Sequence, residues 1–227
     1  MGSTHNRLRS VPQAPAAIFN GMHSTAIRVW HWLSVLVISG SIITVILAST
    51  VFRTRNTISL VQAELTGKGI TASPDQARAV AHAFNDILWD LHKYVGFALC
   101  ALVLFRIAIE ATAPSDKKMT VQLKRALGFK PVEELARLEQ QHYVQVKFIY
   151  LVFYVALILM ALTGLGLAFE DVPLFHAYHR SIKQIHAFLQ WVIYGFIVLH
   201  ITGVILADLG KYKGLVSGMI HGRRLKD

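Results

Sequence analysis

The sequence predicts an all-α integral membrane protein, a four-transmembrane-helix bundle with both termini in the cytoplasm. Its 227 residues are 54% hydrophobic and only 16% charged, whereas a soluble domain carries about 25% charged residues. The uncharged runs 29–52, 148–169 and 184–207 are each long enough for a helix that crosses a bilayer, which takes about 20 residues. A fourth, weaker run lies between the first two.

The helices follow in chain order. A cytoplasmic tail is expected over 1–26, the transmembrane domain over 27–210 and a second tail over 211–227. The four helices are expected at about 27–50, 86–109, 143–169 and 180–207. The second is the weakest, because its uncharged centre is short and lies between Lys93 and Arg106. The first uncharged run has full membrane-spanning length, so it reads as an uncleaved anchor.

Basic residues set the predicted orientation. Lys and Arg number three before Val29, six between Ala111 and His142, and five after Ala207. The other two loops hold four and two. Because cytoplasmic loops are enriched in Lys and Arg, both termini are placed inside. The net charge of +10 is therefore a topology signal, and nucleic acid is not an expected partner.

The loop over residues 53–86 is long for a bundle connection, which favours a docking or capping role. Within it, Ser73, Pro74 and Gln76 form a capping-box pattern, in which serine caps the helix and glutamine follows at the third helical position. A short surface helix is therefore expected there, running into or beside the second span.

Two histidines lie in the last span, and they organise the functional interpretation. His186 and His200 are fourteen residues apart, close to four helical turns, so they share one face and lie roughly 21 Å apart along the axis. With both termini inside, His31 has the depth of His200, and His92 has the depth of His186. Four intramembrane histidines thus sort into two pairs at two depths. Such residues usually face the bundle interior.

Paired imidazoles from facing helices suit haem with two axial histidines, and Gly96 leaves room beside His92 for a flat group. Two histidines without cysteine or a facial carboxylate suit zinc or non-haem iron poorly. Arg28 and Arg106 are expected near the inner surface, where they either offset haem propionates or anchor the helices at the interface. Ordinary interfacial histidines are the alternative for His31 and His92.

At these residues the chain resembles the bacterial di-haem cytochrome b family, which includes the cytochrome b subunits of nickel–iron hydrogenases, formate dehydrogenases and thiosulfate-reductase-type enzymes. The resemblance spans about Thr25 to Lys213, and rests on the stretch Arg28 to Trp32 (R-x-W-H-W), on His92 and on the His186/His200 spacing. It implies two haem b groups, with His31 and His200 binding the inner iron and His92 and His186 the outer one. It also implies a multi-pass protein of the bacterial cytoplasmic (inner) membrane.

The resemblance further implies a respiratory role in which electrons pass between an outer redox subunit, of hydrogenase or dehydrogenase type, and quinone near the inner haem. Electron transfer is favoured over hydrolase or NTPase chemistry, because no nucleophile–base pair or phosphate loop is evident. The long loops favour an electron-transfer subunit of a larger oxidoreductase over a complete enzyme. One alternative is a stand-alone haem quinone oxidoreductase that takes electrons from superoxide or another small donor. Another is a non-redox transporter or membrane anchor.

Overall fold

The computed structural model describes residues 24–131, 133–210 and 214–222, in which every regular element is a helix. Four of the helices are long and apolar enough to cross a membrane. They are α2 (Thr25–Ser49), α4 (Pro74–Thr112), α6 (Glu134–Ala168) and α7 (Pro173–Leu209). The shorter elements are α3 (Thr54–Gly67), η1 (Ser115–Lys117), α5 (Met119–Gly128) and α8 (Leu215–His221). The predicted class, all-helical with four apolar spans, is confirmed.

Helix α2 begins close to its expected start, whereas the other three long helices begin about two turns or more before theirs. Helix α4 starts at Pro74 because the capping box is present: Ser73 Oγ accepts from Gln76 N at 3.2 Å, and Gln76 Oε1 accepts from Ser73 N at 2.9 Å. The surface helix expected here therefore runs directly into the span. Helix α6 likewise begins at Glu134, and proline at the first turn opens α7 at Pro173.

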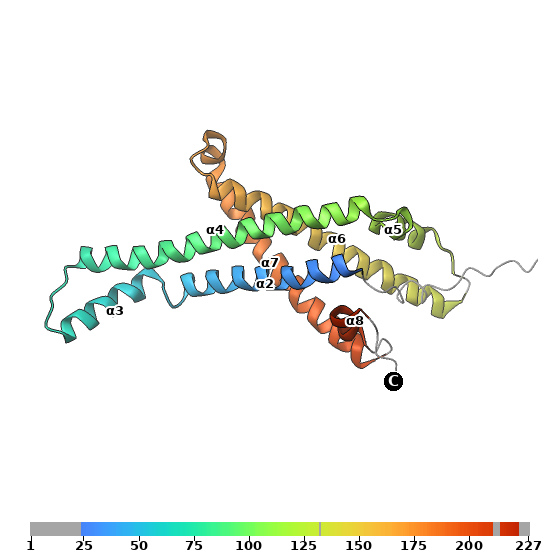
Figure 1. Cartoon of the computed structure of the whole chain (residues 1–227), viewed down its shortest axis with the longest axis horizontal. Coiled ribbons are helices and arrows are strands. Elements are labelled where there is room, and N and C mark those ends of the chain that lie inside the picture. The colour runs from blue at the N-terminus through green and yellow to red at the C-terminus, as the bar shows by residue number, and fades with distance from the viewer. Residues whose placement is uncertain (1–23, 132, 211–213, 223–227) are drawn as a thin grey trace, which may run out of the picture.

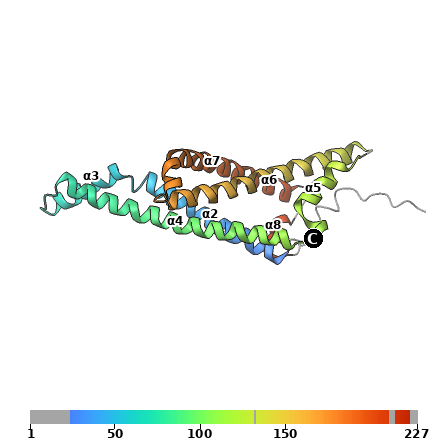
Figure 2. The same cartoon turned by 90° about the horizontal axis from the view of Figure 1, so that it is seen from above.

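The four long helices form two antiparallel pairs that stack as two layers. Helices α2 and α4 lie side by side, and α6 and α7 cross over them (Figures 1 and 2). Helix α4 packs against α6, whereas the backbone of α7 stands away from α2 and α4. The space between α7 and the α2–α4 pair is therefore occupied by side chains and a cavity rather than by close backbone packing.

The buried core lies between the two layers. Leu157 on α6 is 2% exposed and packs with Trp30 of α2 and Leu102 of α4. The Trp30 indole Nε1 donates a hydrogen bond of 2.9 Å to the Leu102 carbonyl. Most other large apolar side chains of the spans are exposed on the outside of the bundle, which is where lipid would contact them.

One end of the bundle carries α3, and we call it the arm end. Asn85 donates to the carbonyls of Ala48 and Phe52 at 3.4 and 3.2 Å, so it marks the level at which α2 finishes. The eleven residues of α4 before Asn85 extend about 16 Å further, at 1.5 Å per residue. Helix α3 packs along them (Figure 1).

The opposite end carries α5 and α8, and we call it the tail end. Helix α8 is fixed to α2 there, because Arg28 donates to the Ile220 carbonyl at 3.1 Å and Trp32 Nε1 donates to the Met219 carbonyl at 3.3 Å. Asp208 of α7 accepts from Leu215 N at 2.7 Å. Helix α8 falls within residues 211–227, which were expected to form a tail. It lies at the same end of the bundle as the first residues of α2.

Candidate functional site

Two histidine pairs lie between α7 and the α2–α4 layer. The first, called the arm-side pair, consists of His92 on α4 and His186 on α7, whose ring centres are 6.4 Å apart with planes at 85°. The second, called the tail-side pair, consists of His31 on α2 and His200 on α7, with ring centres 6.2 Å apart and planes at 57°. The structure therefore brings together the histidines that the sequence analysis grouped by depth.

The arm-side pair lines a cavity of about 290 Å³ with walls from all four long helices. Gly96 and Gly164 lie in this wall, and a Cβ at Gly96 would meet no atom within 4 Å. Most of the wall is apolar, and Lys93 and Lys183 also contribute to it. A cavity of this kind, apolar with a few polar groups, is typical of sites that bind a small molecule or cofactor.

Threonine hydroxyls contact both rings of the arm-side pair. Thr44 Oγ1 lies 3.0 Å from His92 Nδ1, and Thr163 Oγ1 lies 2.9 Å from His186 Nδ1. Because each hydroxyl bonds the Nδ1 atom, the Nε2 atom of each ring is left for another ligand. This arrangement is common around metal-binding histidines, whose second ring nitrogen usually has its own hydrogen-bond partner.

Aromatic rings surround the tail-side pair. Phe196 stacks on His200 at 5.5 Å with planes at 9°, and Tyr150 lies 6.2 Å from the same ring. Trp32 meets His31 edge to face at 5.2 Å. These rings make the surroundings of the tail-side pair bulky and apolar, and they hold its imidazoles from the sides.

The separation within each pair suits two imidazoles that share one metal ion. A His–metal bond is about 2.0–2.1 Å long. With a ring nitrogen about 1.1 Å from its ring centre, two imidazoles opposed across one ion have centres about 6.3 Å apart. The observed 6.4 and 6.2 Å match this value. Each pair offers two imidazoles, and the described residues contain no group of three or more metal-binding side chains. Haem iron needs only such an axial pair.

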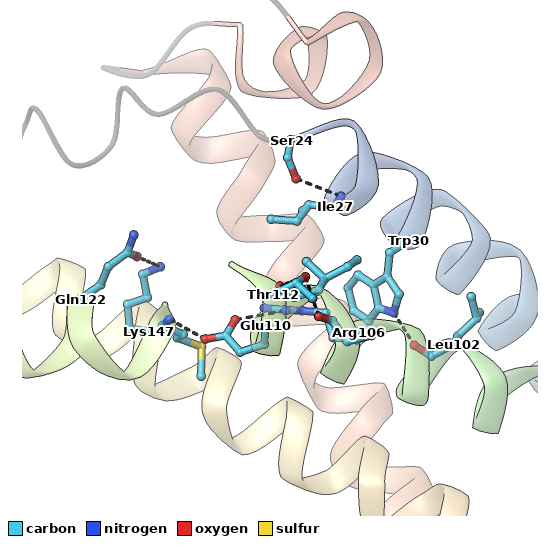
Figure 3. A network of polar contacts seen from close by, with 12 residues as sticks. Ser24, Ile27, Trp30, Leu102, Arg106, Glu110, Thr112, Gln122 and Lys147 are labelled. Carbon is cyan, nitrogen blue, oxygen red and sulfur yellow. Dashed lines mark hydrogen bonds and ion pairs between the residues drawn. The ribbon is translucent and has the colours of Figure 1, made fainter. Parts of the chain in front are cut away.

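Arg28 and Arg106, the two arginines expected near the inner surface, lie at the tail end and contact protein acceptors. Arg28 holds the Ile220 carbonyl and the Thr25 hydroxyl. Arg106 forms an ion pair of 3.2 Å with Glu110 (Figure 3). Its guanidinium also lies 4.9 Å from the ring centre of Tyr154. Their role toward haem propionates stays a prediction.

Several residues of the site were missed by the sequence analysis. Gly164 and Thr163 lie on the third span, to which the sequence analysis assigned no site residue, because its apolar part holds no histidine. An ideal Cβ at Gly164 would lie 3.4 Å from His186 Cε1. Lys183, by contrast, had a usable signal, since it is three residues before His186 and so shares its face of the helix.

Comparison with known proteins identifies the family. A family model described as prokaryotic cytochrome b561 matches residues 22–222, nearly the whole chain. No curated protein and no solved structure matches the chain significantly. The family match confirms the resemblance that rests on the four histidines and the R-x-W-H-W stretch.

Proposed function

Because the chain belongs to the prokaryotic cytochrome b561 family, whose members are transmembrane b-type cytochromes that transfer electrons, we propose that its two histidine pairs each bind one haem b. The observation that supports this most is the pair geometry. Two imidazole pairs, at 6.2 and 6.4 Å, lie on facing helices at two levels of α7. When bound, haem supplies reversible one-electron chemistry at each level.

The chain's own residues would hold and shield these groups. The Nε2 atoms of His92 and His186 serve as ligands on the arm side, because Thr44 and Thr163 contact their Nδ1 atoms. Gly96 and Gly164 keep the cavity wall flat there. On the tail side, His31 and His200 would serve as ligands, with Trp32 in contact with His31 and Phe196 stacked on His200.

We assign the tail end to the cytoplasm and the arm end to the outside of the bacterial inner membrane. The loop with six basic residues, between Ala111 and His142, lies at the tail end together with the start of α2. The test is chemical labelling of single cysteines introduced into α3 and α5, in a chain that lacks Cys100. Labelling of the α5 cysteine from the outside would reverse the assignment.

The direction of electron transfer is proposed from an outer redox subunit, of hydrogenase or dehydrogenase type, to the quinone pool. The projecting arm of α3 and residues 74–84 supports a docking role, because it extends beyond the end of α2. Deleting residues 54–72 is expected to abolish co-purification of a partner while both haems stay bound. A single-subunit protein that takes electrons from superoxide would instead favour the stand-alone oxidoreductase.

We place quinone at the tail end, on the cytoplasmic side. A cavity of about 160 Å³ lies there, and its lining includes Arg106, Glu110 and Tyr154. Quinone reduction consumes protons as well as electrons, so a titratable group near its oxygens is needed. Glu110 is our candidate for this group, because its side chain lines the cavity and is 33% exposed. The Met119 N–H, which donates to Glu110 Oε1 at 2.7 Å, helps to hold the carboxylate in place (Figure 3). A quinone-site inhibitor should perturb the tail-side haem spectrum and leave the arm-side spectrum unchanged.

Haem content and four histidine substitutions test the core of the proposal. The purified protein should contain about two haems per chain, with low-spin spectra typical of two axial histidines. His92→Ala and His186→Ala should remove the same spectral component. His31→Ala and His200→Ala should remove the other.

Exposed histidines outside the bundle core are the matched controls for this series. His82→Ala and His176→Ala should keep both haems, because these side chains lie on exposed parts of α4 and α7. A protein that binds no haem when haem is supplied would refute the proposal and favour the alternative of a non-redox transporter or membrane anchor.

A further inference from the structure

Two threonines fix the rings of the arm-side pair from helices other than those that carry the histidines. Thr44 on α2 lies 3.0 Å from Nδ1 of His92, which is on α4. Thr163 on α6 lies 2.9 Å from Nδ1 of His186, which is on α7. All four long helices therefore join in orienting this one pair.

The direction of these hydrogen bonds follows from the other neighbours of each hydroxyl. Thr44 Oγ1 lies 2.7 Å from the Ser41 carbonyl, and Thr163 Oγ1 lies 2.7 Å from the Leu159 carbonyl. A hydroxyl has one hydrogen, and a carbonyl can only accept. Each hydroxyl therefore donates to its helix carbonyl and accepts from the histidine. Both histidines carry their proton on Nδ1, and the lone pair on Nε2 is available to a metal.

We propose that Thr44 and Thr163 are positioning residues that set the tautomer and orientation of His92 and His186, and thereby lower the reduction potential of the haem at the arm-side pair. This inference rests on the proposed function, and deepens it by assigning two residues that do not touch the haem iron.

The electronic reason lies in the polarity of the hydrogen bond. An acceptor on Nδ1–H shifts electron density onto the imidazole and raises its basicity as a ligand. A more basic ligand stabilises ferric iron over ferrous iron, so the reduction potential falls. Each hydroxyl is itself polarised by donating to a helix carbonyl, which strengthens it as an acceptor.

The neighbours of the tail-side pair differ from those of the arm-side pair, and neither threonine is among those described for it. Phe196 stacks on the His200 ring, and Trp32 meets the His31 ring edge to face. Removing a hydroxyl at Thr44 or Thr163 is therefore expected to act on one haem and leave the other unchanged.

Redox titration of the purified, haem-loaded protein tests the inference. Thr44→Val and Thr163→Val keep the side-chain shape and remove the acceptor. Each should raise the midpoint potential of the arm-side haem and leave that of the tail-side haem at its wild-type value. Thr44→Ser and Thr163→Ser restore the hydroxyl, and should titrate close to wild type. Thr50→Val is the control, because the Thr50 hydroxyl donates to the Ile46 carbonyl of the preceding turn and lies away from the histidine pairs, at the end of α2.

The outcomes separate this inference from the proposed function. Unchanged midpoints in both valine variants, with both haems retained, would overturn the role of the threonines. Loss of the arm-side haem in a valine variant but not in the serine variant would support it. If a valine substitution disrupts the fold, the alanine variant at the same position is titrated instead. A wild-type protein without haem would contradict the proposed function itself.

Discussion

Gly164 offers a direct test of the arm-side site, because a side chain larger than a methyl group would collide with the His186 ring or enter the cavity beside it. An ideal Cβ there lies 3.4 Å from His186 Cε1 and 4.0 Å from Nδ1, which is ordinary contact. Gly164→Ala should therefore leave the ring in place. In Gly164→Leu the next carbon lies about 1.5 Å further out. If the leucine Cγ points toward His186, its distance to the ring falls well below the 3.5–4.0 Å or so at which carbon atoms pack.

The leucine must then displace the imidazole or occupy the cavity beside it, because Gly164 lines that cavity. A binding group is effective only when held within about 0.5 Å of its working position. We therefore expect Gly164→Leu to reduce haem content from about two per chain to one, with loss of the component that His186→Ala also removes.

The assay is haem per chain, read together with the reduced spectrum. Gly195→Leu is the matched control, since Gly195 lies exposed on α7 and a Cβ there meets nothing within 4 Å. Both haems should remain in the control. If Gly164→Leu also keeps both haems and an unchanged spectrum, the cavity around His186 is not a haem site.

Three further substitutions test the core packing and the helix cap that stabilise the fold. Trp30→Phe removes the buried hydrogen bond to Leu102 and should destabilise the fold by about 1 kcal/mol, measured by unfolding in a denaturing detergent. Leu157→Ala leaves a cavity at a side chain that is 2% exposed, and should cost about 2–5 kcal/mol in the same assay. Ser73→Ala breaks the capping box and should cost about 1 kcal/mol, seen as faster hydrogen exchange over residues 74–80 while both haems stay bound.

Much of the fold follows from the sequence, because the bilayer fixes the length of an apolar helix. The spacing of His186 and His200 likewise predicts that both lie on the same face of the last helix, since fourteen residues nearly complete four turns. The start of α6 was harder to predict. Charged residues such as Glu134 continue the helix beyond the apolar run, and hydropathy gives no signal for that extension.

The supporting residues of the site were largely hidden from the sequence. Thr163 contacts His186 only because one face of α6 is turned toward α7, and that rotation depends on packing between two apolar helices. A threonine in a span most often bonds its own helix carbonyl, which Thr163 also does. Its second contact, to an imidazole on another helix, becomes evident only in three dimensions.

The two levels of histidine on α7 also have an electrical consequence. His186 and His200 are roughly 21 Å apart along the helix, about two-thirds of a hydrocarbon layer about 30 Å thick. Moving one elementary charge across the whole membrane involves electrical work of about 2.3 kcal/mol for every 100 mV of membrane potential. For an electron that passes from the arm-side pair to the tail-side pair, the electrical work is therefore roughly 1.6 kcal/mol per 100 mV. If the tail end faces the negative cytoplasm, as we propose, each such transfer works against the membrane potential, and a larger potential then slows the electron transfer that builds it up.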